Sequence, residues 1–210
     1  MPKVFIDGKE HMAAGSRASG TVGELLAELG TELAGSRRMI QEVGLDGVSL
    51  TEASLPEASQ RQAATVGTII LKTMTYQELA RFGLDRADLL LPEVIRDAAQ
   101  CAESFRFRPP EEANRSYATC LEDLQLFVDM VEQALKLTDP HSRAAPPSLQ
   151  QLAAVTGQLL SAHRRDDVMM LADLLSYELV PLLQDMQGVL RELRERVSSP
   201  EDRASRLPSL

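Results

Sequence analysis

Apolar residues recur every three or four positions along residues 166–197, which is the period of a helix with one buried face. Asp166 or Asp167 can cap its start, and Pro181 lies inside, where it removes the hydrogen bond to the carbonyl of Tyr177. We therefore predict one long core helix with a kink near Tyr177. Its predicted buried stripe is Val168, Leu171, Leu175, Leu179, Leu182, Met186, Leu190, Leu193 and Val197.

The same period predicts an all-α antiparallel bundle of four to five helices over residues 75–198, because helices joined by short loops usually pack antiparallel. Thr75 and Glu78 have the spacing of a capping box at its start, and Ser148 with Gln151 can cap a later helix. Residues 199–210 lack a period and are predicted to be a disordered tail. The helices expected before the long one are Leu79–Phe82, Leu89–Phe105, Glu111–Leu137 and Ser148–His163.

Residues 1–74 show short apolar runs separated by tight-turn signals, which predicts a small α+β domain. The dipeptides Asp7-Gly8 and Asp46-Gly47 favour two-residue hairpin turns, and Thr21-x-x-Glu24 is a capping box in front of an amphipathic helix. The predicted strands are Lys3–Ile6, Lys9–Met12, Met39–Leu45, Val48–Leu50 and Thr65–Thr73. The fold class is therefore α+β, with the helical bundle following the N-terminal domain.

The VFIDGKE opening and the TVGELLAEL helix resemble the β-grasp, or ubiquitin-like, fold, and most of all its small bacterial sulfur carriers. That resemblance implies a compact sheet that serves as a docking surface or as a stabilising cap. Sulfur carriers end in a free Gly-Gly tail that is adenylated. This sequence contains no Gly-Gly, and its last predicted strand runs into a helix, so the carrier chemistry is not transferred.

A second resemblance covers residues 166–186, where DDVMM precedes ADLLSYELVPLLQDM. This run is similar to poorly characterised bacterial helical proteins, some of them associated with motility or surface functions. Asp173, Tyr177 and Pro181 are spaced by four and share one helix face, and with Glu178 they form the candidate partner-binding set. The alternative is structural: Tyr177 caps the core with its hydroxyl bonded to Asp173. Flexible thioethers at Met169, Met170 and Met186 suit a binding groove, with packing in the core of the helix stripe as the structural alternative.

Composition narrows the class of protein further. The 210 residues include 44% hydrophobic and 4% aromatic side chains, and the net charge is −9, which argues against a general binder of nucleic acids or anionic membranes. Carboxylates interrupt the apolar run after Val168, so we predict no membrane insertion. Cys101 and Cys120 are predicted to be reduced, with a disulfide between adjacent helices as the alternative. The opening MPKVFIDGKE does not resemble a targeting signal, so we expect a cytoplasmic localisation.

Reactive groups are scarce, and we predict no catalytic residue, no cofactor and no metal site. None of the three histidines, His11, His141 and His163, has the spacing of a metal-binding motif, although His163 with Asp166 and Asp167 offers a cation site as an alternative to loop polarity and helix capping. The glycines form no phosphate-binding loop, and no nucleophile elbow is present.

The function that the sequence predicts is that of a non-enzymatic protein–protein interaction or adaptor module of a bacterial-type cytoplasmic system. Its partner would be another protein or a second copy of itself, giving a homodimer. Two alternatives stay open: a small-ligand or metal-dependent enzyme with a pocket between the domains, and a ubiquitin-like carrier, which the missing Gly-Gly disfavours.

Overall fold

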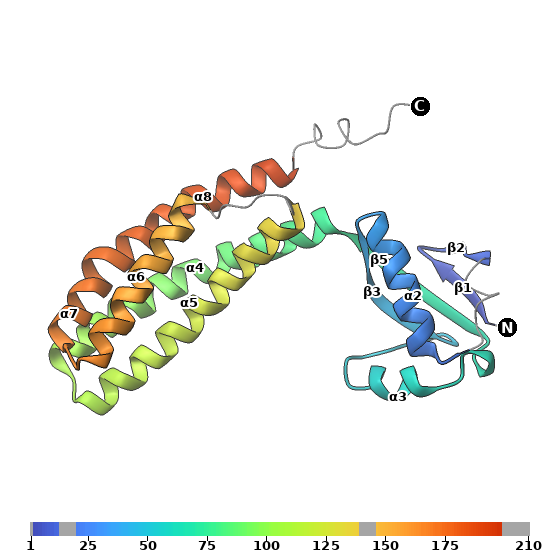
Figure 1. Cartoon of the computed structure of the whole chain (residues 1–210), viewed down its shortest axis with the longest axis horizontal. Helices are drawn as coiled ribbons and strands as arrows, with labels where there is room; N and C mark the ends of the chain where they lie inside the picture. Colours follow the sequence, from blue (N-terminus) through green and yellow to red (C-terminus); the bar gives the residue numbers. More distant parts are fainter. Residues whose placement is uncertain (1, 13–19, 139–145, 199–210) are drawn as a thin grey trace. The chain divides into compact units, whose positions relative to one another are not determined.

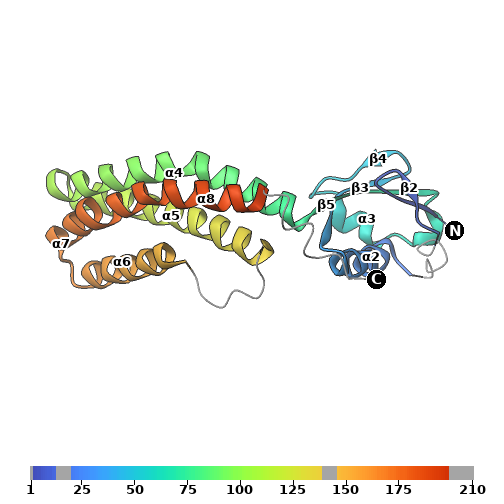
Figure 2. The same cartoon turned by 90° about the horizontal axis from the view of Figure 1, so that it is seen from above.

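The computed structural model describes residues 2–12, 20–138 and 146–198, which form an α+β protein with an N-terminal sheet followed by helices (Figures 1 and 2). The chain divides into two compact units, Met1–Glu78 and Leu79–Leu210. The predicted tail 199–210 and the loop residues around His141 lie outside the described residues.

The first unit is a mixed five-stranded sheet in the order β2-β1-β5-β3-β4. The central strand β5 pairs in parallel with β1 and antiparallel with β3. The short edge strands β2 and β4 each return from a hairpin turn. The strands are β1 (Lys3–Ile6), β2 (Lys9–Glu10), β3 (Arg38–Leu45), β4 (Val48–Ser49) and β5 (Thr68–Thr75); the helices are α2 (Val22–Gly35), α3 (Leu55–Gln60) and a 3-10 turn (Ala63–Thr65).

Local chemistry explains most of these elements. Asp7 and Gly8 have φ angles of 49° and 80°, as a two-residue hairpin turn requires, and the predicted hairpin is confirmed. The predicted capping box is also present: Thr21 N–H donates to Glu24, and Glu24 N–H donates to Thr21. Three details of the prediction were wrong: α3 was not expected, the second strand ends at Glu10 and does not reach Met12, and the last strand does not start at Thr65, which the 3-10 turn occupies. The core is Val4, Val22, Leu25, Leu29, Leu45, Ala58, Ala63, Val66, Ile69 and Leu71.

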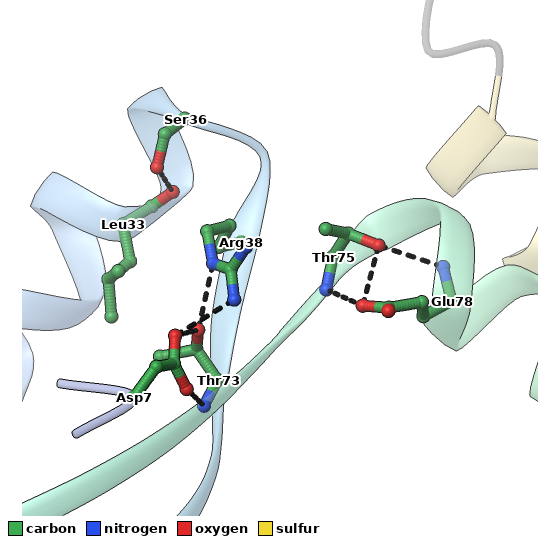
Figure 3. A network of polar contacts seen from close by, with 7 residues as sticks. All are labelled: Asp7, Leu33, Ser36, Arg38, Thr73, Thr75 and Glu78. Atoms are coloured by element: carbon green, nitrogen blue, oxygen red, sulfur yellow. Dashed lines mark hydrogen bonds and ion pairs between the residues drawn. The ribbon is translucent and has the colours of Figure 1, made fainter. Parts of the chain in front are cut away.

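A cluster of polar contacts ties the first hairpin to the middle of the sheet (Figure 3). The Asp7 carboxylate accepts hydrogen bonds from the backbone N–H of Thr73 at 2.8 Å, from the Thr73 hydroxyl at 2.6 Å and from Arg38 Nη2 at 2.9 Å. Arg38 Nε also donates to the Thr73 hydroxyl at 2.8 Å. These bonds, those from Thr73 first, hold the pKa of Asp7 below its ordinary value.

Because its native pKa is lowered, Asp7 stabilises the first unit above pH about 4, and this contribution is lost as the pH falls through the native pKa. We expect Asp7→Asn to destabilise the unit at neutral pH by about 1 kcal/mol, since the carboxylate is partly exposed and screened. The difference from the wild type should disappear at low pH. Hydrogen exchange of the β1 and β5 amides measures the stability of the unit in both proteins as a function of pH.

Asp46→Asn is the matched control for this change. Asp46 occupies the equivalent place in the second hairpin turn, but its carboxylate accepts only from the backbone amides of Gly67 and Thr68. An asparagine oxygen can accept the same bonds, so this variant should destabilise the unit less than Asp7→Asn at neutral pH. Equal effects of the two substitutions at every pH would contradict the role given to Arg38 and the Thr73 hydroxyl.

The second unit is helical, and its helices lie side by side around one core (Figures 1 and 2). Two expectations were wrong here. The separate helices predicted before and after Gly83 are one continuous helix that contains both Gly83 and Pro92, and the start of α6 has Pro146 in the cap position in place of a side-chain cap from Ser148. The helices are α4 (Tyr76–Phe107), α5 (Pro110–Thr138), α6 (Pro147–Arg164), α7 (Val168–Asp173), the π-helical segment η2 (Leu174–Leu179) and α8 (Val180–Ser198).

Tertiary packing explains why α4 is not broken. A Cβ built on Gly83 would lie 3.9 Å from the Cβ of Ala134, so the glycine sits where α4 and α5 approach each other closely. Buried leucine and valine side chains flank Pro92, and their packing offsets the missing backbone bond. At its first turn, α4 has the predicted capping box between Thr75 and Glu78 (Figure 3).

Long-range contacts give the directions of these helices. Near its start α4 approaches Ala134 late in α5, whereas near its end Phe105 packs against Tyr117 early in α5, with ring centroids 5.7 Å apart. The two helices therefore run antiparallel. Arg194 near the end of α8 forms ion pairs with Asp85 and Asp88 near the start of α4, both at 2.7 Å.

The last helix contains a π-helical segment where a kink was predicted. Within it, the N–H of Val180 donates to the carbonyl of Leu175, five residues back. Pro181 follows directly, and a regular α-helix there would leave the carbonyl of Tyr177 without its donor and crowd it against the proline ring. The wider turn lies where that conflict would arise.

The π segment also changes which leucines are buried. Leu171, Leu175, Leu179 and Leu183 are fully buried at successive spacings of four, a spacing that drifts by about 40° per step in a regular α-helix. The extra residue in the wider turn compensates for that drift. The prediction of Leu182 as a core residue was therefore wrong, because Leu183 takes the core position. Val168 was also wrong, since it is exposed.

This register can be tested with two neighbouring substitutions. We expect Leu183→Ala to lower the free energy of unfolding by about 2 to 5 kcal/mol, because it opens a cavity in the core. Leu182→Ala should cost only about 1 kcal/mol, since Leu182 packs against the rim of the core. Denaturant unfolding of the full chain measures both. A larger loss for Leu182→Ala would mean that the helix keeps a regular α-helical register.

Candidate partner-binding surface

The four residues predicted to bind a partner lie on the surface of the last helix. Asp173 ends α7, Tyr177 and Glu178 belong to the π-helical segment, and Pro181 is the second residue of α8. All four are exposed, and Tyr177 has 70% of its surface accessible. The structural alternative for Tyr177, a cap on the core, is therefore wrong.

Arg106, near the end of α4, brings two of these residues together. Its Nη2 donates to the Asp173 carboxylate at 2.9 Å and lies 3.5 Å from the carbonyl oxygen of Ala172. The guanidinium carbon lies 5.7 Å from the centre of the Tyr177 ring, a cation–π geometry. Asp173 thus pairs with Arg106 and not with the Tyr177 hydroxyl, which was the predicted alternative.

Exposed methionines extend this surface by one turn towards the start of α7. Met169 and Met170 lie four and three residues before Asp173, on the same side of the helix, and are 60% and 45% exposed. We call Arg106, Met169, Asp173, Tyr177 and Pro181 the recognition stripe. Met186, which was grouped with these methionines, is fully buried in the core and is not part of it.

The ion pair in the stripe contributes little to folding. Asp173 is more than half exposed and Arg106 about a quarter, and exposed pairs of this kind contribute about 0 to 1 kcal/mol. The tyrosine ring gains little from burial either, because most of it remains in water. The contacts therefore fix the orientation of a charged and an aromatic side chain on the surface.

Arg106 is the residue of this surface that sequence reasoning missed. It is separated from Asp173 by 67 positions and belongs to a different helix. No periodicity links the two residues, and an arginine in the last turn of a helix has an ordinary explanation in the helix dipole. Only the packing of α4 against the last helix shows the pairing.

The cation site considered at His163, Asp166 and Asp167 has other contacts. The His163 ring packs against Tyr117 with centroids 5.0 Å apart, and the Asp167 carboxylate caps α7 by accepting from the N–H of Met170. Across residues 2–12, 20–138 and 146–198, no group of three or more histidines, cysteines or carboxylates is placed to hold a metal ion. The same ranges contain no buried charged side chain.

Comparison with known proteins places the stripe in a shared domain. A family model described as a domain of unknown function (DUF8042) matches residues 84–189, just over half of the chain. The chain belongs to the DUF8042 family. The matched DUF8042 region includes every residue of the recognition stripe and excludes the sheet. No curated protein and no solved structure matches the chain significantly. Of the described helices of this DUF8042 protein, none combines the length and apolar character needed to cross a bilayer.

A conservative substitution separates a surface role of Arg106 from a structural one. Arg106→Lys keeps the charge but loses the planar group over Tyr177, so the NMR resonances of the Tyr177 ring should shift. The free energy of unfolding should change by less than about 1 kcal/mol. Arg108→Lys, two residues on and outside the stripe, is the control and should leave the Tyr177 resonances unchanged. A loss of more than about 2 kcal/mol with Arg106→Lys would show that the pair supports the fold.

Proposed function

We propose that this DUF8042 protein is a non-enzymatic protein-interaction or adaptor module whose helical unit binds a protein partner through the recognition stripe. The observation that carries the proposal is the exposed Tyr177 ring, stacked on an arginine that Asp173 holds in place. We further propose that the protein works in a bacterial-type cytoplasmic system.

The composition of the stripe supports binding to protein. Tyrosine, arginine and methionine are enriched at protein interfaces, and tyrosine and arginine dominate their binding energy. Tyr177 offers a rigid ring with few torsions to immobilise, and Arg106 is already held by its ion pair, so both lose little conformational freedom on binding. Met169 in the stripe and Met170 beside it add flexible apolar surface that adapts to a partner. Exposed carboxylates such as Glu178 lie at the rim and can orient the partner.

We also propose finer assignments for the two units. The sheet order β2-β1-β5-β3-β4, with a parallel central pair, is compatible with a β-grasp fold, and the sheet then serves as a second docking surface or as a stabilising cap. The contacts of α4 with α5 and α8 are compatible with an antiparallel four-helix bundle. A carrier function is less favoured, because β5 leads into the capping box of α4.

The test is a photo-crosslinking amino acid placed in the stripe. With the crosslinker at Met169, we expect a discrete protein adduct in extracts of the source organism. Tyr177→Ala in the same chain should reduce the adduct at least about tenfold, as loss of a central interface residue does. Sedimentation of the purified protein separates the two kinds of partner, since a second copy would appear as a dimer that Tyr177→Ala dissociates.

Leu89 provides the matched control, because it is an exposed apolar residue of α4 outside the stripe, with 73% of its surface accessible. The crosslinker at Leu89 should give no such adduct, and Leu89→Ala should leave the Met169 adduct unchanged. Equal adducts from both positions, or an adduct insensitive to Tyr177→Ala in a correctly folded protein, would refute the proposal.

A further inference from the structure

Two free cysteines face each other in the core of the helical unit. Cys101 belongs to α4 and Cys120 to α5, and neither has any accessible surface. Both belong to the same core cluster, and each thiol lies close enough to the other to shift its pKa.

The register of the two helices explains this contact independently. Phe105 and Tyr117 touch edge to face across the same pair of antiparallel helices. Cys101 lies one turn before Phe105 on α4, and Cys120 lies one turn after Tyr117 on α5. In antiparallel helices these two steps lead to the same level, so the thiols must lie opposite each other. The sequence spacing alone does not show that the thiols face each other, because their positions depend on the register in which α4 and α5 pair.

We propose that Cys101 and Cys120 are a redox-active pair that closes an intramolecular disulfide between α4 and α5 when the protein meets a peroxide. This assignment does not depend on the proposed function, since both thiols are buried and neither belongs to the recognition stripe.

The two sulfurs have different roles in the reaction. The hydrogen bond from Cys120, supported by one from Ser116, lowers the pKa of Cys101 against the opposing effect of burial. The same contact together with burial raises the pKa of Cys120. We therefore assign the first attack on the oxidant to Cys101 and the resolving step to Cys120.

The chemistry balances with hydrogen peroxide as the oxidant. The Cys101 thiolate attacks one peroxide oxygen, the O–O bond breaks, and a sulfenic acid and hydroxide form. The Cys120 sulfur then attacks the Cys101 sulfur, the S–O bond breaks, and its hydroxyl group leaves as water with the thiol proton of Cys120 or one from solvent. The two thiols lose two electrons in total, and the peroxide is reduced to water.

A surface groove lies beside the pair. The groove has a volume of about 750 Å³, lies between α4 and α5, and is lined by polar side chains that include Gln100, Ser104, Ser116 and Thr119. Ser116 lines this groove and lies close enough to the Cys101 thiol to lower its pKa.

The experiment treats the folded full-length protein with hydrogen peroxide, blocks remaining thiols by alkylation, and measures the intact mass and the linked peptides. We expect a monomer that has lost the mass of two hydrogen atoms, with Cys101 joined to Cys120 and the change reversed by dithiothreitol. The oxidised protein should melt several degrees higher than the reduced one, because the crosslink restricts the unfolded chain. Two thiols that remain alkylatable only after denaturation, or a disulfide between two chains, would overturn the proposal.

Single substitutions test the order of the steps. In Cys120→Ala, Cys101 should gain oxygen and react with a sulfenic-acid probe such as dimedone. In Cys101→Ala, Cys120 should stay unmodified over the same time, and oxygenation of both variants at equal rates would contradict the assigned roles. The wild-type mass measurement needs no variant, so the disulfide itself remains testable if either alanine variant fails to fold.

Discussion

Proline has no backbone N–H and cannot donate the hydrogen bond of a regular α-helix. In the last helix of the protein, a change from α-helical to π-helical geometry accompanies this missing donor at Pro181. The π-helical segment directly before it widens the helix by one residue per turn. That extra residue removes the crowding at the carbonyl of Tyr177 and brings leucines spaced by four back onto one buried face. A regular α-helix would keep the crowding at the Tyr177 carbonyl. It would also turn leucines spaced by four residues progressively away from the core.

The outer side of the same segment forms the recognition stripe. While Leu175 and Leu179 are fully buried, Tyr177 between them points into solvent beside Arg106. The buried leucines supply the stabilising free energy, and the exposed ion pair and ring supply almost none. The stripe can therefore vary in sequence without loss of the fold, and its geometry still depends on the core that sets the phase of the helix.

The sequence predicts those features of the fold that depend on neighbouring residues. The Asp7-Gly8 hairpin and both capping boxes follow from turn and cap chemistry within four residues, and the structure confirms them. Features that depend on distant packing were missed. Gly83 suggests a break in α4 until its close approach to α5 is known, and a regular helical period selects Leu182 where the π segment selects Leu183. For the candidate site, the sequence identifies the residues on the last helix but not Arg106.

Two arginine–aspartate contacts join α4 to the last helix at opposite ends, and they differ in how the guanidinium is engaged. Arg194 engages two carboxylates, Asp85 and Asp88, so its guanidinium is occupied on both sides. Arg106 engages one carboxylate and stacks on the ring of Tyr177, which is 70% exposed. The DUF8042 match contains the whole Arg106 contact and ends before Arg194. The Arg106 end of α4 thus lies wholly within the region that the DUF8042 family shares, whereas the contact at the other end is only partly within it.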